Sequence, residues 1–317
     1  MASYIARRVA YLIPIWLGIT VLAFLISTLA PGDPARIYFQ RTHGRQPSQQ
    51  ELQIVRDRFN LDKPVVEQYV SWLSGAVRGD LGVSFTTGKP VLDELLLRFP
   101  ATLTLAFWAT VVTVVIAIPI GILAAIKRNS VLDQVTRAMS MLGASIPSFW
   151  LALLLIILFS VKLQWLPASG QQGWESLILP ALALGLGDAA VVARLTRSSL
   201  LEILNEDYVK TARAKGLSEG RIMIRHILRN GMAAVVTQIG LAFGFLLAYS
   251  AIVEVIFVWP GIGRLAVDAI GQRDYTMIQG FVVFAGSIFV LINLAVDLFY
   301  MWLDPRVTLG GQGAVAG

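Results

Sequence analysis

Long apolar runs separated by polar stretches dominate the pattern of hydrophobic and polar positions. Six runs reach the length of about 20 helical residues that crossing a bilayer requires. They lie at Val9–Ala30, Ala101–Ile126, Ala138–Val161, Ser176–Ala193, Ala233–Phe257 and Gln279–Trp302. Each run is predicted to be a helix, because a backbone in lipid must satisfy its own hydrogen bonds and none of the runs alternates as a barrel strand would. The fourth run is the weakest, since it is rich in glycine and interrupted by Asp188.

Proline interrupts three of these runs, at Pro119, Pro147 and Pro180. The stretch Ser145-Ile146-Pro147-Ser148 is the best candidate for a bend, because small polar side chains can satisfy the carbonyls that a proline frees. Pro119 is interpreted as the ordinary proline of a membrane helix.

The first long connection, Pro31–Pro100, is predicted to be a small ordered cap rather than a tail. Ser48 and Glu51 have the spacing of a capping box, in which each side chain satisfies the other residue's free backbone N–H. Three apolar side chains then share one helix face: Leu52, Val55 and Phe59. Pro90 is expected to open a further helix that leads straight into the second span.

The second long connection, Arg194–Met232, is too structured to be a simple linker. Apolar and basic residues alternate in a helical stretch around Asn205–Lys215. Gly216 suits the left-handed residue that closes a helix, and Ser218 can begin the next one. The sequence therefore predicts a helix–glycine–helix elbow.

Charge determines the predicted orientation. With the N-terminus inside, the cytoplasmic segments hold 14 Lys and Arg residues and the two short outer loops hold three. The cap contains nine basic residues balanced by eight acids. Both termini are therefore predicted to be cytoplasmic. The apolar part of the first run has 22 residues, more than the roughly 7–15 of a cleavable signal core, so an uncleaved helix is favoured and cleavage after Ala30 is the minor alternative.

Composition agrees with a membrane protein. The chain has 317 residues, of which 56% are hydrophobic and 15% charged, whereas soluble domains contain about a quarter charged residues. The net charge of +6 is explained by basic residues that flank apolar runs, and no basic face interleaved with aromatics predicts a nucleic-acid partner.

Several chemistries lack the residues that they need. The sequence contains no cysteine and only two histidines, His43 and His226, which fall on opposite sides of the predicted membrane. No metal site and no enzymatic constellation is therefore expected. No G-x-x-x-x-G-K-[ST] phosphate loop occurs, so any ATP that drives this protein must be hydrolysed by a separate chain.

At the elbow, the residues resemble a known family. The stretch EDYVKTARAKGLS, Glu206–Ser218, followed by RHILRN at Arg225–Asn230, resembles the ATPase-docking loop of ABC-importer permeases, whose common pattern is Glu-Ala-Ala-x-x-x-Gly. Lys210, Thr211 and Ala212 stand where that pattern begins, and Gly216 matches its glycine. The departure at the first two positions is typical of the dipeptide, oligopeptide and nickel branch.

The resemblance covers nearly the whole chain. Further segments with the order and membrane context of this branch are Pro31-Gly32-Asp33-Pro34, Gly79-Asp80-Leu81-Gly82, Trp259-Pro260-Gly261, Arg273-Asp274-Tyr275 and Asp304-Pro305-Arg306. It implies an all-α integral membrane protein with six transmembrane helices of the type I ABC importer permease fold. It also implies one permease domain over residues 1–317, with an extracytoplasmic elaboration at 31–100 and an ATPase-coupling loop at 194–232.

The resemblance further implies the partners and the membrane. These would be a second homologous permease, two ABC ATPases that hold ATP and magnesium, an extracytoplasmic substrate-binding protein, and a bacterial or archaeal cytoplasmic membrane. No cofactor is expected in this chain. The residues implied in ATPase coupling are Glu206, Tyr208, Lys210, Thr211, Ala212, Arg213, Ala214, Lys215, Gly216, Leu217 and Ser218. The alternative for the same segment is a solvated basic loop that only obeys the charge rule.

Polar residues inside the spans are candidates for the translocation pathway, because charges in a membrane are costly and usually face a cavity or a partner. They are Asp188, Glu254, Asn293 and Asp297. For Glu254 and Asp297 the alternative is an interhelical hydrogen bond or an interfacial position, and for Asp188 it is a structural pair or an interfacial position.

The expected cargo is a di- or oligopeptide, with nickel complexes or glutathione as alternatives within the same branch. An ion-coupled secondary transporter using Asp188 and Glu254 is the less favoured class, because no inverted repeat is visible.

Overall fold

The computed structural model describes residues 2–29 and 32–303, and these residues form helices joined by short loops. The helices are α1 (Ala2–Leu29), α2 (Pro34–His43), α3 (Gln49–Arg58), α4 (Val65–Ala76), α5 (Val91–Ile126), α6 (Val131–Ser145), α7 (Ser148–Leu155), η1 (Ile156–Lys162), α8 (Glu175–Leu204), α9 (Asp207–Ala214), α10 (Glu219–Ile222), η2 (Met223–Leu228), α11 (Arg229–Tyr249), α12 (Ala251–Ile256), α13 (Ile262–Gly271) and α14 (Tyr275–Leu303). The segments η1 and η2 are π-helical. The Asp304-Pro305-Arg306 motif lies outside the described residues.

Five helical segments are long and apolar enough to cross a membrane, and a bent pair supplies a sixth span if it is counted as one. The five are the apolar part of α1, then α5, α8, the continuous segment from α10 to α11, and the apolar part of α14. This agrees with the six predicted spans. The helices do not, however, end where the apolar runs end. For example, α8 continues 11 residues beyond the predicted end of the fourth span at Ala193. Hydropathy marks only the lipid-facing length, and a helix continues into water wherever packing supports it.

The predicted third span is two helices rather than one. α6 and α7–η1 meet at an angle of 101°. Pro147 stands just before α7, and Ile146 has the extended backbone that a residue before proline favours. The bend predicted at Ser145–Ser148 is therefore confirmed, while Pro119 lies inside the unbroken α5.

An ion pair holds α6 against α8. Asp133 is fully buried and receives two hydrogen bonds from the guanidinium of Arg197, at 2.5 and 2.9 Å. The backbone N–H of Asn129 donates a third, at 3.0 Å. Because the pair and the backbone satisfy the buried carboxylate, α6 stays on α8 while α7 turns away.

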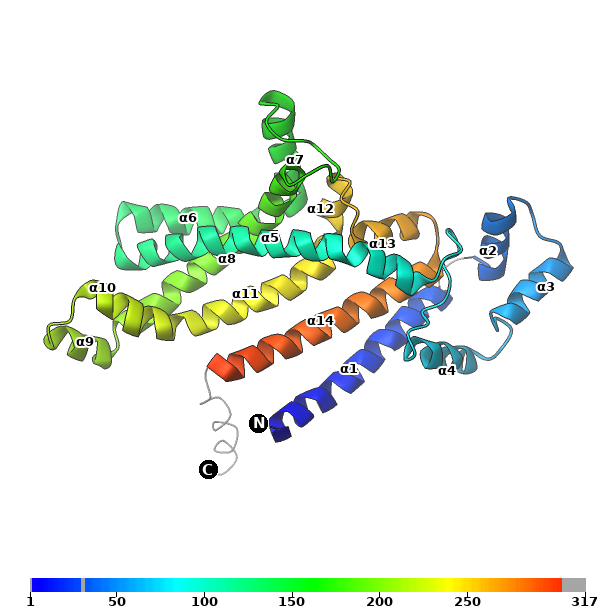
Figure 1. The fold of residues 1–317 in the computed structure, drawn as a ribbon, viewed down its shortest axis with the longest axis horizontal. Helices are drawn as coiled ribbons and strands as arrows, with labels where there is room; N and C mark the ends of the chain where they lie inside the picture. Colours follow the sequence, from blue (N-terminus) through cyan, green and yellow to red (C-terminus); the bar gives the residue numbers. More distant parts are fainter. Residues whose placement is uncertain (1, 30–31, 304–317) are drawn as a thin grey trace.

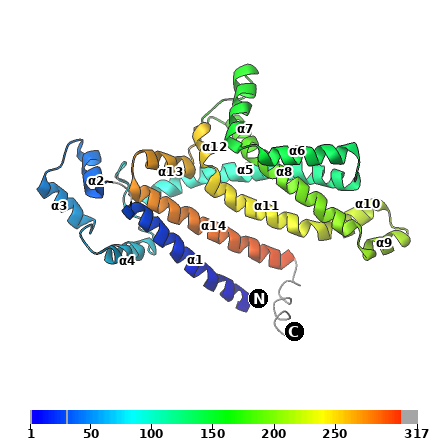
Figure 2. The same cartoon turned by 180° about the vertical axis from the view of Figure 1, so that it is seen from behind.

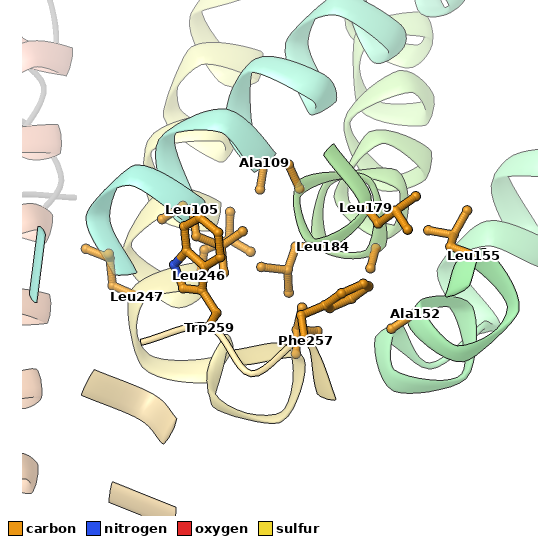
Figure 3. Close-up of a cluster of buried hydrophobic side chains, with 14 residues drawn as sticks. Leu105, Ala109, Ala152, Leu155, Leu179, Leu184, Leu246, Leu247, Phe257 and Trp259 are labelled. Carbon is orange, nitrogen blue, oxygen red and sulfur yellow. The ribbon is translucent and has the colours of Figure 1, made fainter. Parts of the chain in front are cut away.

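Small residues bring α5 and α8 together along most of their length. A Cβ added at Gly185 would lie 2.5 Å from the carbonyl oxygen of Ala109, and one at Gly121 would lie 2.6 Å from Thr196 Cβ. Close helix approach of this kind lets two membrane helices pack through van der Waals contact. The same pair of helices borders the largest buried cluster, where Trp259 and Phe257 lie among leucine side chains (Figure 3).

The cap consists of α2, α3 and α4. The predicted capping box is present, since Ser48 and Glu51 exchange hydrogen bonds with each other's backbone N–H. Leu52 and Val55 are buried against α2, and Phe59 packs on the same cluster, as the face pattern predicted. The sequence pattern did not predict α2 and α4 as separate helices.

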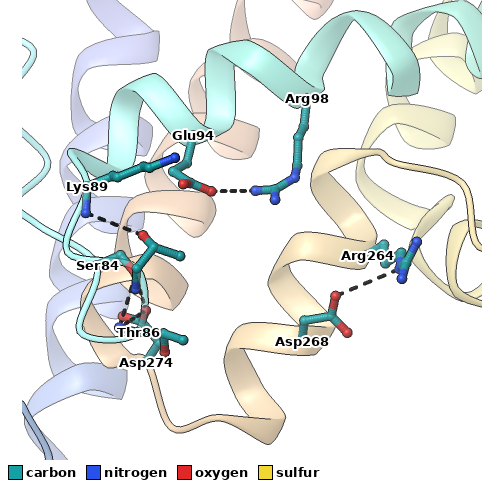
Figure 4. Close-up of polar contacts among 9 residues, drawn as sticks. Ser84, Thr86, Lys89, Glu94, Arg98, Arg264, Asp268 and Asp274 are labelled. Atoms are coloured by element: carbon teal, nitrogen blue, oxygen red, sulfur yellow. Dashed lines mark hydrogen bonds and ion pairs between the residues drawn. The ribbon is translucent and has the colours of Figure 1, made fainter. Parts of the chain in front are cut away.

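Asp274 joins the cap-side loop to the start of α14. Its buried carboxylate accepts hydrogen bonds from the Ser84 hydroxyl at 2.5 Å and from the backbone N–H of Thr86 at 3.1 Å (Figure 4). The backbone N–H groups of Phe85 and Met277 also donate to it, at 3.1 Å each. Four donors compensate the cost of burying this charge. The loop before α5 is thereby fixed to the last span.

The cap and the elbow lie at opposite ends of the molecule. In Figure 1 the cap is at one end of the long axis, and α9 and α10 are at the other. α1 and α14 run side by side in both views, and the first residues of α1 and the last residues of α14 point away from the cap (Figures 1 and 2).

Candidate functional site

The elbow, residues 206–219, lies between α8 and the continuous helical segment that leads into α11. It consists of α9, a tight turn and the start of α10. The predicted second helix begins after Ser218, but it is not separate: α10 has four residues and continues through η2 into α11. The Ser218 side chain makes no capping hydrogen bond. The elbow is therefore attached directly to the fourth and fifth spans.

Gly216 closes α9 in the predicted way. Its φ is +76°, in the left-handed region that favours glycine. The N–H of Gly216 donates to the carbonyl of Arg213 at 2.9 Å, and the N–H of Leu217 donates to that of Ala212 at 3.3 Å. These two bonds form a Schellman motif, which satisfies carbonyls at the end of a helix.

A small apolar core stiffens the elbow. Val209 is 0% exposed and Ala212 is 6% exposed. Both pack in a cluster with Leu200 of α8, Ile222 of α10 and Ile227 of η2. Ala212 is among the residues implied in ATPase coupling, but its methyl group lies inside the elbow.

Polar contacts tie the two arms of the elbow together. The Arg213 guanidinium contacts both carboxylate oxygens of Glu219, at 2.8 and 3.2 Å, across the turn. The side-chain amide of Asn230 donates to the Tyr208 hydroxyl at 3.0 Å. Lys210 pairs with Asp207 at 2.8 Å, and its hydrogen bond holds the pKa of Asp207 below the usual range. The Arg213–Glu219 and Asn230–Tyr208 links were not foreseen, because the turn brings these residues together.

The remaining elbow residues form the outer surface. Leu217 is half-buried, and the exposed members of the predicted coupling set are Glu206, Tyr208, Lys210, Thr211, Arg213, Ala214, Lys215, Gly216 and Ser218. Tyr208 keeps 40% of its surface exposed although its hydroxyl is bonded. The surface thus combines an aromatic ring, small side chains at the turn and flexible cations.

Three of the pathway candidates lie in different environments. Asp188 of α8 borders a cavity of about 150 Å³ and makes no hydrogen bond or ion pair with any other described residue. Asn293 of α14 donates to the Phe289 carbonyl of its own helix at 2.9 Å.

Glu254 is fully buried among donors of the chain itself. Its carboxylate accepts from the hydroxyls of Thr102 and Ser250 at 2.8 Å each and from the backbone N–H of Arg264 at 2.9 Å. A Cβ added at Gly263 would lie 3.0 Å from this carboxylate. The structure thus favours the interhelical hydrogen bond over the pathway for Glu254, since the turn after Trp259 is built around its side chain.

Metal chemistry has no support in the part of the chain that the structure describes. No group of three or more His, Asp or Glu side chains there could hold an ion.

The fold is a bundle of long apolar helices with a structured elbow at one end, which is the architecture of a polytopic membrane protein. Two family models match the chain. "Binding-protein-dependent transport system inner membrane component" matches residues 117–309, and the N-terminal component of the same system matches residues 1–106. The chain belongs to this family of ABC-importer permeases, and it is a transport subunit rather than an enzyme.

Curated relatives extend the match to the full length. The glutathione transport system permease protein GsiC of Escherichia coli O6:H1 is 44% identical over 97% of this chain and 99% of its own. The proteins of the same name from Escherichia coli K12 and Shigella dysenteriae serotype 1 are 43% identical over the same shares.

Solved structures support the fold. The inward-facing MetNI methionine ABC transporter matches 66% of this chain and 96% of its own chain, with a TM-score of 0.57 and 23% identity. An amino acid ABC transporter matches 68% of this chain and 94% of its own, with a TM-score of 0.50. The predicted fold class, an all-α permease of the type I importers, is confirmed.

Proposed function

We propose that this chain is one of two permease subunits in an ATP-driven importer, and that the elbow docks one of two ABC ATPases. The observation that carries the proposal is the construction of the elbow. Its core, its Schellman turn and its cross-turn ion pair make α9 a stiff element attached to two spans. Movement of a docked ATPase is transmitted only through a stiff contact, because a flexible loop would absorb it.

The elbow surface is proposed to be the contact itself. Its exposed turn contains Ala214, Lys215 and Gly216. The small residues Ala214 and Gly216 permit close approach of another chain there. ATP and magnesium would be held by the ATPases, on the cytoplasmic side that also holds both termini. A second permease would complete the translocation path across the cytoplasmic membrane, and a binding protein would deliver cargo on the side of the cap.

The proposed cargo is a small peptide. The relatives named above are glutathione permeases, and glutathione is a tripeptide, so this class lies within the predicted branch. A nickel complex is the second candidate, supported only by the branch resemblance of the elbow.

Single-cysteine cross-linking tests the docking assignment, because the chain has no cysteine of its own. Ala214→Cys, labelled with a thiol-reactive benzophenone, should form a photo-cross-link to a co-expressed partner ATPase, because the benzophenone inserts into C–H bonds and needs no second cysteine. Gln50→Cys, exposed on the cap at the opposite end, is the matched control and should give no such product. Equal cross-linking at both positions, or none at Ala214→Cys, contradicts docking at the elbow.

Reconstitution separates the two classes of transporter. Uptake into liposomes should require ATP and the ATPases. Uptake by the permeases alone under a proton or sodium gradient would establish the ion-coupled alternative instead.

A further inference from the structure

Asp188 is a carboxylate inside a membrane span with no partner in the described chain. It lies 13 residues after the start of α8 at Glu175, which places it about 20 Å along the helix axis. Neither a hydrogen bond nor an ion pair to another described residue satisfies it, in contrast to the buried Asp133, Glu254 and Asp274. An ionisable residue at such a depth is expensive unless it meets a partner or a cavity.

A cavity of about 150 Å³ adjoins this carboxylate. It forms where four helices meet, because the 101° turn between α6 and α7 leaves space beside α8 and the end of α11. Its polar wall consists of Asp188, Ser148 and Tyr249, and the Tyr249 hydroxyl donates to Ser148 Oγ at 3.3 Å. Gly187, beside Asp188, has no atom within 4 Å of an added Cβ, so this wall is open.

The chemistry of the wall selects a cation. One carboxylate and two hydroxyl oxygens supply acceptors, and no Lys or Arg lines the cavity. A primary ammonium group has three N–H donors, which match that set. The volume of about 150 Å³ is well above the roughly 10–15 Å³ that one water needs, so the cavity has room for an ammonium group.

The neighbouring larger cavity does not have this character. It holds about 460 Å³ between α5, α6 and α8, and no charged side chain lines it. The two cavities share Gly143, Ile146, Leu151 and Gly187, so they adjoin, and Asp188 is the charged residue among their linings.

We propose that Asp188, together with the Ser148 and Tyr249 hydroxyls, forms a subsite on the translocation path that binds the primary ammonium group of the cargo. The inference rests on the proposed importer function only in naming cargo as the ligand. A Lys or Arg side chain of the second permease offers the same chemistry, and the experiment below separates the two sources.

The test measures the electrostatic preference of the cavity in the assembled transporter. Val191 lines the cavity one helical turn after Asp188, and Val191→Cys would be the chain's single cysteine. The rate at which this cysteine is modified is measured with a cationic and with an anionic methanethiosulfonate of similar size. Mass spectrometry distinguishes the modified chain from the unmodified one. The cation should react faster, and Val191→Cys/Asp188→Asn should lower the cation-to-anion ratio by about tenfold or more. A unit charge at about 6 Å gives roughly tenfold even at the dielectric constant of water, because it affects the two reagents in opposite directions.

The matched control removes an equal charge elsewhere. Asp268→Asn, on the exposed outer helix α13, should leave the ratio at Val191→Cys unchanged. A competition arm then uses n-butylammonium and the neutral butyramide. Only the ammonium should slow modification by the cationic reagent, and only while Asp188 is present.

Each other outcome overturns the proposal. No modification at Val191→Cys means that the cavity is closed to water in the complex. If Asp188→Asn leaves the cation-to-anion ratio unchanged, the carboxylate is already neutralised. The same follows if n-butylammonium and butyramide protect the cysteine equally. A cationic side chain of the second permease would have this effect. The assay needs no ATP, so its failure leaves the cross-linking test of the elbow unaffected.

Discussion

Gly216 provides the sharpest test of the idea that the elbow must keep its shape. A Cβ added at this position would meet no neighbouring atom within 4 Å, so the expected effect of a valine comes from the backbone and not from a Cβ clash. The φ of +76° is one that β-branched residues hardly adopt. Left-handed geometry costs an L-residue roughly 1–2 kcal/mol.

The alternative for the variant is to leave the left-handed region, which breaks the two Schellman hydrogen bonds. Each is worth about 1 kcal/mol, and the packing of Leu217 near Ala212 would be lost with them. By either route the free energy of the native elbow rises by about 2 kcal/mol relative to that of distorted conformations. This changes the equilibrium constant between native and distorted elbow by a factor of roughly 30.

The chain contains a matched control for this substitution. Gly220 lies four residues on, in α10, with equally open space and no left-handed backbone. Gly220→Val should therefore stay near wild type. Gly216→Asn should be intermediate, since asparagine tolerates left-handed geometry better than valine does.

The assay is the ratio of cargo taken up to ATP hydrolysed, in proteoliposomes that contain the complete transporter at equal amounts of assembled permease. We expect Gly216→Val to lower the ratio on the order of tenfold while membrane insertion is retained. If Gly216→Val and Gly220→Val give the same ratio, the geometry of the turn does not matter for coupling and the reasoning fails.

Two further predictions concern packing and pH. Gly185→Ala should destabilise the solubilised protein by about 1–3 kcal/mol in thermal unfolding, because the new methyl group would lie 2.5 Å from the Ala109 carbonyl oxygen of α5. The control, Gly187→Ala, should be neutral, because its added Cβ meets no atom within 4 Å. Equal changes in stability for the two variants would contradict close packing of α5 against α8. In the cap, hydrogen bonding from Arg45 lowers the pKa of Glu51 from 4.5 to about 2, so this carboxylate stabilises the folded cap fully above pH 4.5 and loses that contribution as the pH falls toward 2. The rate at which pepsin cleaves the cap should therefore rise as the pH falls from 4.5 toward 2. Glu51→Gln should be cleaved faster than wild type at pH 4.5, and its cleavage rate should depend less on pH. If the pH profile of cleavage is the same for Glu51→Gln and wild type, the role of Glu51 is refuted.

Local rules predicted the features whose causes are local. The capping box at Ser48, the left-handed closure at Gly216 and the bend at Pro147 each depend on residues within a few positions of one another. Hydropathy located the spans for a similar reason, since each residue's transfer to lipid is nearly independent of the fold. It could not locate helix ends such as that of α8, which packing decides.

Features that depend on distant partners could not be predicted. The carboxylate of Asp274 accepts a hydrogen bond from Ser84, 190 positions away in the chain. The carboxylate of Glu254 accepts one from Thr102, 152 positions away. An aspartate or a glutamate in sequence alone is equally a pathway residue or a structural acceptor. Only the donors that the fold brings to it distinguish the two.

By itself, the sequence determined that this protein is a six-span helical permease with an elbow at Gly216, because apolar length, capping residues and a short motif act through local chemistry. The tertiary structure decided which polar groups are already satisfied. It placed Ala212 inside the elbow, enclosed Glu254 among hydroxyl and backbone donors, and left Asp188 beside a cavity with no partner in the described chain. The physical reason is that burial and hydrogen bonding are properties of pairs of residues, and the pairs exist only once the helices have packed.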